Sequence, residues 1–405
     1  MRIIAAFASG ILACGVAGGP IDPPAGPVGP TMKPLHELEP RTALSAAATP
    51  GDNDATPSVY RITQPGSYYL TGNVGVAAGK IGIEIASDDV TLDLGGFSVS
   101  GGLACIIALH PNGPGTPLTG IRVTNGSVRG ATAYGCGLPF ADGSHVENLT
   151  ALECDVGVQV GEGCTVRGCT ARGGRTGFQA DQASIFRDCS ASENEETGFL
   201  LLGDGGVLSG CMAAHNGGLG YLLGQASSIT NSVAMSNDMG GFAVLQDCIV
   251  ADCTAKDNGG IGVQTGQGCV VRNTASSYSG THGIEVSSLT TVEGCTTRYN
   301  GHDGINAGWQ CRIVSNTCTF NGQASAAGAG IRLVSYRNRV ESNMLNHNDK
   351  GVVAEGTDNF IATNTAGSNS GGNFEVAAGN EMAPVVTNPG SSGFAGMTPW
   401  SNVAY

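Results

Sequence analysis

Charged and aromatic residues are scarce in this sequence. Of its 405 residues, 13% are Asp, Glu, Lys or Arg and 5% are Phe, Trp or Tyr. The charges are also unbalanced, because 33 acidic residues face 19 basic ones and the formal net charge is −14. A surface this negative repels phosphate backbones, so nucleic acid is excluded as an expected partner.

Several motifs that carry chemistry are absent as well. There is no CxxC pair, which argues against a zinc site, and no EF-hand or RTX calcium motif follows Asp52-Asn53-Asp54. The sequence has no GxSxG, no Walker loop and no dinucleotide-binding fingerprint. Beyond the first residues, no segment is long and apolar enough to be a membrane helix. We therefore expect no metal site, no nucleotide site and no transmembrane segment.

The N-terminus resembles an export signal over residues 1–17. One basic residue precedes an apolar run from Ile3 to Ala13, which is too short to span a bilayer. The tetrad that ends in Cys14 resembles a bacterial lipoprotein cleavage box, in which Cys14 would carry lipid. Ordinary cleavage after Ala17 and translation from Met32 are the alternatives. We expect an exported protein, whether extracellular, periplasmic or on the cell surface.

Glycine, in contrast, is abundant, and it marks an internal repeat. From residue 157 on, a glycine followed by alternating residues recurs at steps of 20, 21, 22, 21, 21, 21, 21, 26, 21 and 21 residues. Ten steps this regular indicate a solenoid. The phrases are GVQV at 157, GFQA at 177, GFLL at 198, GYLL at 220, GFAV at 241, GVQT at 262, GIEV at 283, GINA at 304, GIRL at 330, GVVA at 351 and GNFE at 372.

A second phrase lies within each repeat and places Cys or Asn three residues after an apolar residue. Examples are VRGCTA at 166, VEGCTT at 292 and IVSNTC at 313. The pieces alternate with period 2 and are separated by Gly, Asn, Asp and Ser, which indicates short strands. A leucine-rich repeat is the alternative solenoid, but Leu is sparse and the return segments are short. We therefore predict an all-β, single-domain parallel β-helix with three strands and about 21 residues per coil.

These phrases resemble right-handed parallel β-helix proteins of the pectate-lyase-like type, in which an asparagine ladder marks one turn. Asn316, Asn343 and Asn364 match that ladder, and five cysteines occupy the same column: Cys169, Cys189, Cys211, Cys253 and Cys295. The opening (59–99) and the ending (373–405) also resemble a bacterial family of exported β-helix proteins, from which no activity follows. The resemblance allows calcium as a cofactor, and the residues themselves identify none.

The domain organisation follows from these patterns. Residues 18–58 are rich in Pro, Gly and Ala and carry no sustained period, so we predict a leader or linker there. The β-helix is predicted to occupy residues 59–380, and residues 381–405 are predicted to form a capping tail.

The cysteines number thirteen once Cys14 is set aside, and an odd number cannot all pair within one chain. Side chains in register on neighbouring coils point in parallel rather than toward each other. We therefore expect mostly free thiols that act as small buried hydrophobic groups.

An outward row of side chains is predicted along the first strand. In the glycine phrase the two apolar residues point inward and the residue between them points outward. The row reads Gln159, Gln179, Leu200, Leu222, Ala243, Gln264, Glu285, Asn306, Arg332 and Val353, with Glu84 and Arg122 expected in the less regular coils before it. Polar residues gather from Gln264 to Arg332. The residue before each glycine forms a neighbouring column, which places His282 one coil before Asp303.

This polar stretch gives the candidate site. A histidine beside a carboxylate can act as a general base. The candidate catalytic residues are His282, Glu285, His302, Asp303 and Arg332, and the candidate substrate-binding residues are Gln264, Asn306 and Lys350. The stretch around His282 faintly resembles the Gly-His-Gly of polygalacturonase-like hydrolases, and His302-Asp303 resembles part of a mannuronan epimerase motif. The elements that accompany both motifs are absent.

Turn chemistry offers a simpler explanation of the same residues. Turns in a β-helix favour His, Asn, Asp and Gly, which tolerate tight backbone conformations. Glu285 and Arg332 can equally be solubilising charges. By resemblance and by its long polar faces, the protein is expected to engage a polysaccharide, either as a lyase, epimerase or hydrolase or as a non-catalytic adhesion, carbohydrate-binding or structural solenoid.

Overall fold

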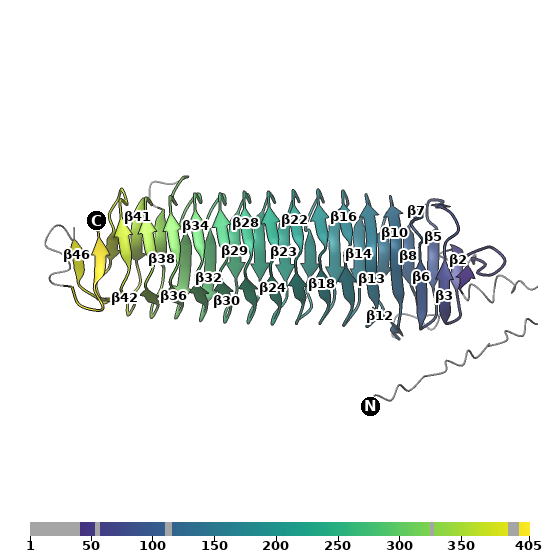
Figure 1. The fold of residues 1–405 in the computed structure, drawn as a ribbon, viewed down its shortest axis with the longest axis horizontal. Helices are drawn as coiled ribbons and strands as arrows, with labels where there is room; N and C mark the ends of the chain where they lie inside the picture. The colour runs from purple at the N-terminus through teal and green to yellow at the C-terminus, as the bar shows by residue number, and fades with distance from the viewer. Residues whose placement is uncertain (1–40, 53–56, 110–115, 325–327, 388–396) are drawn as a thin grey trace, which may run out of the picture. The chain divides into compact units, whose positions relative to one another are not determined.

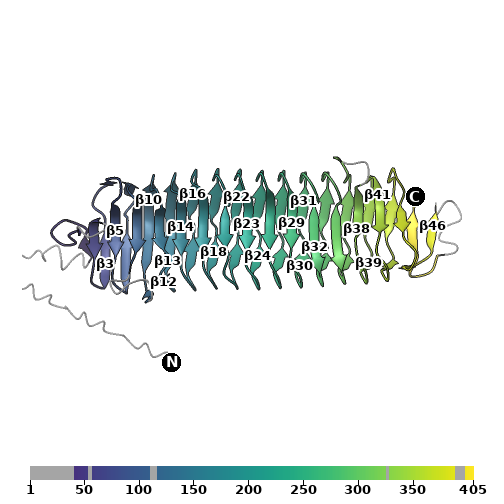
Figure 2. The same ribbon diagram turned by 180° about the vertical axis from the view of Figure 1, so that it is seen from behind.

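The computed structural model describes residues 41–52, 57–109, 116–324, 328–387 and 397–405. Across these ranges the chain consists of β-strands and turns without a helix, and every strand pair is parallel. Residues 41–405 form one unit whose coils follow one another in chain order (Figures 1 and 2). The predicted export signal and Cys14 lie outside the described residues.

One strand of each coil belongs to a 15-stranded sheet, which we call sheet B. Its neighbours in space are the corresponding strands of adjacent coils, as the predicted repeat requires. The strands are β2 (Ser58–Ile62), β5 (Ile81–Ile85), β8 (Ala104–Ala108), β11 (Tyr134–Leu138), β14 (Val156–Val160), β17 (Thr176–Ala180), β20 (Phe199–Leu201), β23 (Leu219–Leu223), β26 (Gly240–Val244), β29 (Ile261–Thr265), β32 (Ile284–Ser288), β35 (Ile305–Trp309), β38 (Ala329–Leu333), β41 (Lys350–Ala354) and β44 (Phe374–Val376).

Most coils contribute two further, short strands to a 30-stranded sheet, which we call sheet A. In two coils a single strand of eight residues replaces them, β10 (Arg122–Arg129) in one and β13 (His145–Leu152) in the next. A typical coil contributes β15 (Thr165–Arg167) and β16 (Thr170–Arg172). Pairing extends from β1 (Thr42–Ala43), which lies beside β3 (Gly66–Tyr69), to β47 (Asn402–Ala404), which lies beside β43 (Thr365–Gly367). The all-β parallel fold with three strands per coil is therefore confirmed.

Each regular coil turns at three residues with left-handed backbone. In one coil these are Gly163, Gly168 and Gly173, with φ of 65°, 62° and 70°. Glycine has no Cβ and adopts this region at no steric cost, whereas other residues are rare there. The residue after each of the first two turns points inward, as Cys164 and Cys169 do. The sequence thus sets the corners by placing Gly, Asn, Asp or Ser at most of these positions.

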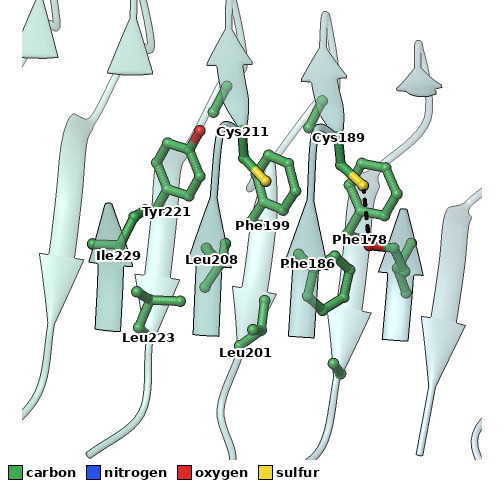
Figure 3. Packing of buried hydrophobic residues seen from close by; sticks show 14 of the residues in the cluster. Phe178, Phe186, Cys189, Phe199, Leu201, Leu208, Cys211, Tyr221, Leu223 and Ile229 are labelled. Atoms are coloured by element: carbon green, nitrogen blue, oxygen red, sulfur yellow. Dashed lines mark hydrogen bonds between the residues drawn. The ribbon is translucent and has the colours of Figure 1, made fainter. Parts of the chain in front are cut away.

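The core consists of side chains that stack coil upon coil. Phe178, Phe199 and Tyr221 from successive strands of sheet B are buried and stack with centroid distances of 4.8 and 4.9 Å (Figure 3). Phe242 of the next strand continues the stack at 4.8 Å from Tyr221. Farther along the chain the same inward position holds aliphatic residues. These are paired in register and fully buried, and they are Ile284, Ile305, Ile331 and Val352. These residues share one interior, as the predicted repeat requires.

The predicted asparagine ladder is present, and it is one of three. Asn316 Nδ2 donates to Asn343 Oδ1 at 3.0 Å, and Asn343 Nδ2 donates to Asn364 Oδ1 at 2.9 Å. A ladder that was not predicted runs at another corner through Asn194, Asn216, Asn237 and Asn258, and again through Asn300, Asn321, Asn348 and Asn369. The third joins Asn338, Asn359 and Asn380.

The thirteen cysteines of the described residues are all free and buried. Those in the ladder columns donate weak hydrogen bonds to nearby carbonyls, as Cys189 Sγ does to Arg187 O at 3.2 Å. Burial raises the pKa of Cys136 and Cys318 to about 12, which keeps these thiols protonated at neutral pH. The prediction of free, core-forming thiols is confirmed.

Two details of the predicted register are wrong. Arg122 does not precede the outward row, because it begins β10 (Arg122–Arg129) of sheet A and pairs with Thr91 and His145. The GNFE phrase is displaced by one residue, since Val352 pairs with Phe374 and Val353 pairs with Glu375. The outward residue of that coil is therefore Glu375.

Candidate functional site

The outward row of sheet B brings the candidate binding residues into line. Gln264 pairs with Glu285, Glu285 with Asn306, and Asn306 with Arg332. Successive strands lie about 4.8 Å apart, so these four side chains form one continuous strip along the coils. Gln264 is exposed, and the other three are partly exposed. The row is the one that the glycine phrase predicts.

Asp303 is a buried carboxylate that contacts several other residues of the candidate site. Its side chain is only 4% exposed, and it accepts hydrogen bonds from the backbone N–H of Ala329 at 2.7 Å and from Arg332 Nε at 3.0 Å. Burial alone would raise the pKa of Asp303, but the neighbouring imidazole of His282 and the hydrogen bonds from Ala329 and Arg332 outweigh it and lower the pKa. Asp303 is therefore a fixed carboxylate at neutral pH.

His282 lies between this buried carboxylate and the exposed row. Its Nδ1 is 3.2 Å from Asp303 Oδ2, although the ring N–H is not aligned for a hydrogen bond. Its Nε2 is 3.8 Å from Glu285 Oε2. The ring also meets the edge of His302 at a centroid distance of 5.4 Å and an angle of 77°. A turn residue alone would explain the backbone position of His282, but not its place between two carboxylates.

Arg332 and Lys350 are held in ion pairs at the C-terminal end of the site. Arg332 Nη1 contacts Glu355 Oε1 at 2.5 Å in addition to its bonds with Asp303. These ion pairs outweigh burial and raise the pKa of the Arg332 guanidinium. Lys350 forms an ion pair with Glu375. Both basic residues thus already face carboxylates of the chain itself.

Several buried polar atoms at the site have no hydrogen-bond partner in the described chain. They are Thr281 Oγ1, His282 Nδ1 and Asn306 Oδ1. Buried polar groups are nearly always hydrogen-bonded, so each such atom calls for an explanation. Thr281 and His282 lie in one turn, and Asn306 lies in the next coil. Bound water or a ligand at this place would complete their hydrogen bonding.

The acidic partners Glu355 and Glu375 were not predicted as part of the site. Glu375 follows Val353 in the outward row, but the one-residue displacement of the GNFE phrase concealed it. Glu355 lies just beyond the end of β41, where strand alternation gives no direction.

The arrangement is suited to acid–base chemistry by His282 rather than by a pair of carboxylates. Asp303 is buried, accepts hydrogen bonds from Ala329 and Arg332, and lies 3.2 Å from His282 Nδ1, so it stabilises a positive charge on the imidazole. His282 Nε2 and Glu285 lie at the exposed row, where a bound hydroxyl could exchange a proton. Within the described ranges, no three His, Cys, Asp or Glu side chains lie close enough together to hold a metal ion. No helix in those ranges is long and apolar enough to cross a membrane.

Solved structures with a similar chain path share little sequence with this protein. The A-module of a mannuronan C-5 epimerase from Azotobacter vinelandii is 16% identical over 84% of this chain and 91% of the module, with a TM-score of 0.39. A tailspike protein mutant of E. coli bacteriophage HK620 is 12% identical over 87% of this chain and 71% of its own, with a TM-score of 0.45. Values this low say nothing about the activity of this chain.

Comparison with sequences and family models separates two levels of similarity. No curated protein sequence matches the chain. The family model described as "Right handed beta helix region" matches residues 129–271 and 245–388, which together exceed half of the chain. The stacked parallel coils of the structure agree with this match. The chain belongs to the right-handed β-helix family.

Proposed function

We propose that this protein engages a polysaccharide along the outer face of sheet B, between Gln264 and Arg332. The row presents an amide, a carboxylate and a second amide from three successive coils, in register. A polymer that repeats its own hydroxyl groups can meet such an array at several units at once, which adds avidity. The observation that carries the proposal is the group of unpartnered buried polar atoms beside this row, on Thr281, His282 and Asn306.

Catalysis at the same face is the second candidate. It is favoured by the position of His282, with Nδ1 at 3.2 Å from a buried carboxylate and Nε2 at 3.8 Å from a carboxylate of the row. This leaves one ring nitrogen to exchange a proton with a bound sugar. A lyase, an epimerase and a hydrolase all need such a group. A binding module does not.

The test measures binding and turnover separately on neutral and uronic-acid polysaccharides, each with and without calcium. The variants are His282→Ala and, as a matched control, His145→Ala, whose exposed imidazole belongs to sheet A. Turnover that is lost only in His282→Ala establishes catalysis. Binding without turnover that survives His282→Ala establishes a module. Failure of every polysaccharide to bind contradicts the proposal.

We also propose that the protein acts outside the cytoplasm. The support is the N-terminal pattern of one basic residue, an apolar run from Ile3 to Ala13 and Cys14. Cell fractionation with radiolabelled palmitate distinguishes a secreted chain from one anchored by lipid on Cys14. Retention of the full-length chain in the cytoplasm contradicts the proposal.

A further inference from the structure

A shallow depression continues the candidate site toward the N-terminus of the chain. Its volume is about 250 Å³, below the range of roughly 300–1,000 Å³ typical of pockets that enclose a drug-sized ligand. The depression is therefore large enough for one ring of a small molecule rather than for a whole drug-sized ligand. Its lining includes Leu219, Met239, Ala243, Ile261, Gln264 and Thr281.

The depression leads directly into the acid–base cluster. Gln264 at its edge pairs with Glu285 of the next coil, and Thr281 immediately precedes His282. Ala243, which also lines the depression, occupies the outward row one coil before Gln264. A ligand seated here would therefore extend along the row toward His282 without leaving the face of sheet B.

The lining has two kinds of surface that a sugar ring requires. Met239, whose side chain is 66% exposed, forms an apolar wall together with Leu219 and Ile261. At the other side Gln264 offers an exposed amide, and the Thr281 hydroxyl oxygen is buried without a partner in the described chain. A pyranose presents an apolar C–H face and a rim of hydroxyl groups. The apolar wall and the polar edge match these two sides.

The charges near the depression distinguish between classes of sugar. Four carboxylates lie along the adjoining face, on Glu285, Asp303, Glu355 and Glu375, against two basic side chains. Both basic residues, Arg332 and Lys350, already form ion pairs with these acids. A uronic-acid polymer would add one more carboxylate per unit to a face that is negative, and like charges disfavour binding.

We propose that the depression seats an uncharged pyranose ring of a neutral polysaccharide, whose next units lie over Glu285 and His282. This inference rests on the proposed function. It also narrows the chemistry, because lyases and epimerases remove a proton from a carbon made acidic by a neighbouring carboxylate. A neutral substrate lacks that carboxylate, so hydrolysis or binding alone remains.

The experiment compares uncharged gluco-, manno-, galacto- and xylo-oligosaccharides with oligouronates by isothermal titration calorimetry. Ala243→Trp fills the depression, and Gln179→Trp places the same side chain on the same row three coils away. Met239→Glu is a second test at an exposed position, where folding is not at stake. We expect at least a tenfold loss of affinity for a neutral oligosaccharide in Ala243→Trp and Met239→Glu and no loss in Gln179→Trp.

The alternative outcomes separate this inference from the proposed function. One outcome is that binding of a neutral oligosaccharide is lost in Glu285→Gln but unchanged in Ala243→Trp and Met239→Glu. This outcome contradicts a sugar ring in the depression and leaves the proposed polysaccharide-binding face intact. Tighter binding of oligouronates than of neutral sugars overturns the inference that the ligand is neutral and leaves the polysaccharide face intact. No binding of either class contradicts the proposed function itself.

A charge variant sharpens the same argument. Replacing both Glu355 and Glu375 by Gln removes the carboxylates that pair with Arg332 and Lys350. We expect the affinity for oligouronates to rise relative to that for neutral oligosaccharides, most clearly at low salt. An unchanged ratio of the two affinities contradicts the electrostatic basis for a neutral ligand.

Discussion

Two stretches of the β-helix share the same backbone repeat but differ in the side chains of their core and of their outward row. From β17 to β26 the interior holds a stack of aromatic rings, and the outward row is largely apolar, with Leu200, Leu222 and Ala243. From β32 to β41 the interior is aliphatic and the outward row carries Glu285, Asn306 and Arg332. A fixed backbone repeat thus allows the core and the surface to vary separately.

Aromatic residues of the second stretch lie on the outside. Tyr278, Tyr299, Phe320 and His347 stack at one corner with centroid distances of 5.1, 5.0 and 4.8 Å. Each has left-handed backbone, with φ between 54° and 57°, which is unusual for bulky residues. Their rings cover one another, so edges rather than faces meet the solvent. The comparison teaches that ring stacking follows from the register wherever the sequence places rings.

The largest expected effect is on the inner stack. Phe199→Ala removes a fully buried ring between Phe178 and Tyr221 and should lower the free energy of unfolding by about 3–5 kcal/mol. The matched change in the outer stack, Tyr299→Ala, should cost less than about 1 kcal/mol because the ring is partly solvated and its backbone strained. Urea unfolding followed by circular dichroism measures both, and equal losses would show that position does not matter.

The ladders give the next contrast, between asparagine and cysteine in the same column. Asn343 donates to Asn364 and Ile313 and accepts from Asn316, so Asn343→Ala leaves several buried groups unpaired and should cost about 2–4 kcal/mol. Cys211→Ala removes a small thiol whose bond to Ser209 O is long, at 3.5 Å, and should cost about 1 kcal/mol. A Cys211→Ala variant as unstable as Asn343→Ala would refute this ranking.

A smaller effect, confined to acid, is expected at Asp303. Its pKa is lowered in the folded chain, so its stabilising contribution is present above the unfolded pKa of about 3.9 and is lost as pH falls through the folded value. Asp303→Asn should therefore be less stable than the parent at pH 7 and should show a shallower decline of stability between about pH 5 and pH 2. Parallel acid limbs of the two stability curves would contradict this.

The burial of the thiols is expected to slow their reaction with thiol reagents. The native protein should react slowly with a thiol reagent, since all thirteen described cysteines are buried. After denaturation without reductant, at least thirteen thiols per chain should titrate. Recovery of only about one reactive thiol, as full disulfide pairing of an odd number would leave, contradicts the account of the columns.

Much of the fold could be predicted because the repeat imposes it. Glycine and alternation recur in the sequence, so the register that joins Gln264, Glu285, Asn306 and Arg332 followed from spacing alone. The ladder through Asn194 was visible too, as an Asn three or four residues before most of the glycine phrases from GFLL onward. Arg122 was misplaced because β10 is eight residues long and departs from the short-strand pattern.

Of the candidate site, only the residues whose positions follow from the regular repeat could be predicted from the sequence. The spacing predicted that His282 lies beside Asp303. It did not predict the hydrogen bonds that Asp303 accepts from Ala329 and Arg332, because these residues belong to the following coil. Met239 of the apolar wall lies in a turn, and turns carry no alternation that gives the direction of a side chain.

Hydroxyl-radical footprinting with a bound neutral oligosaccharide tests the central claim most directly. Met239 is 66% exposed beside the candidate site, whereas Met212 and Met344 are 42% and 48% exposed on sheet A and serve as internal controls. We predict that the ligand slows oxidation of Met239 and leaves Met212 and Met344 unchanged. Protection of the sheet A methionines with Met239 still fully reactive would place the ligand on another face and contradict the account.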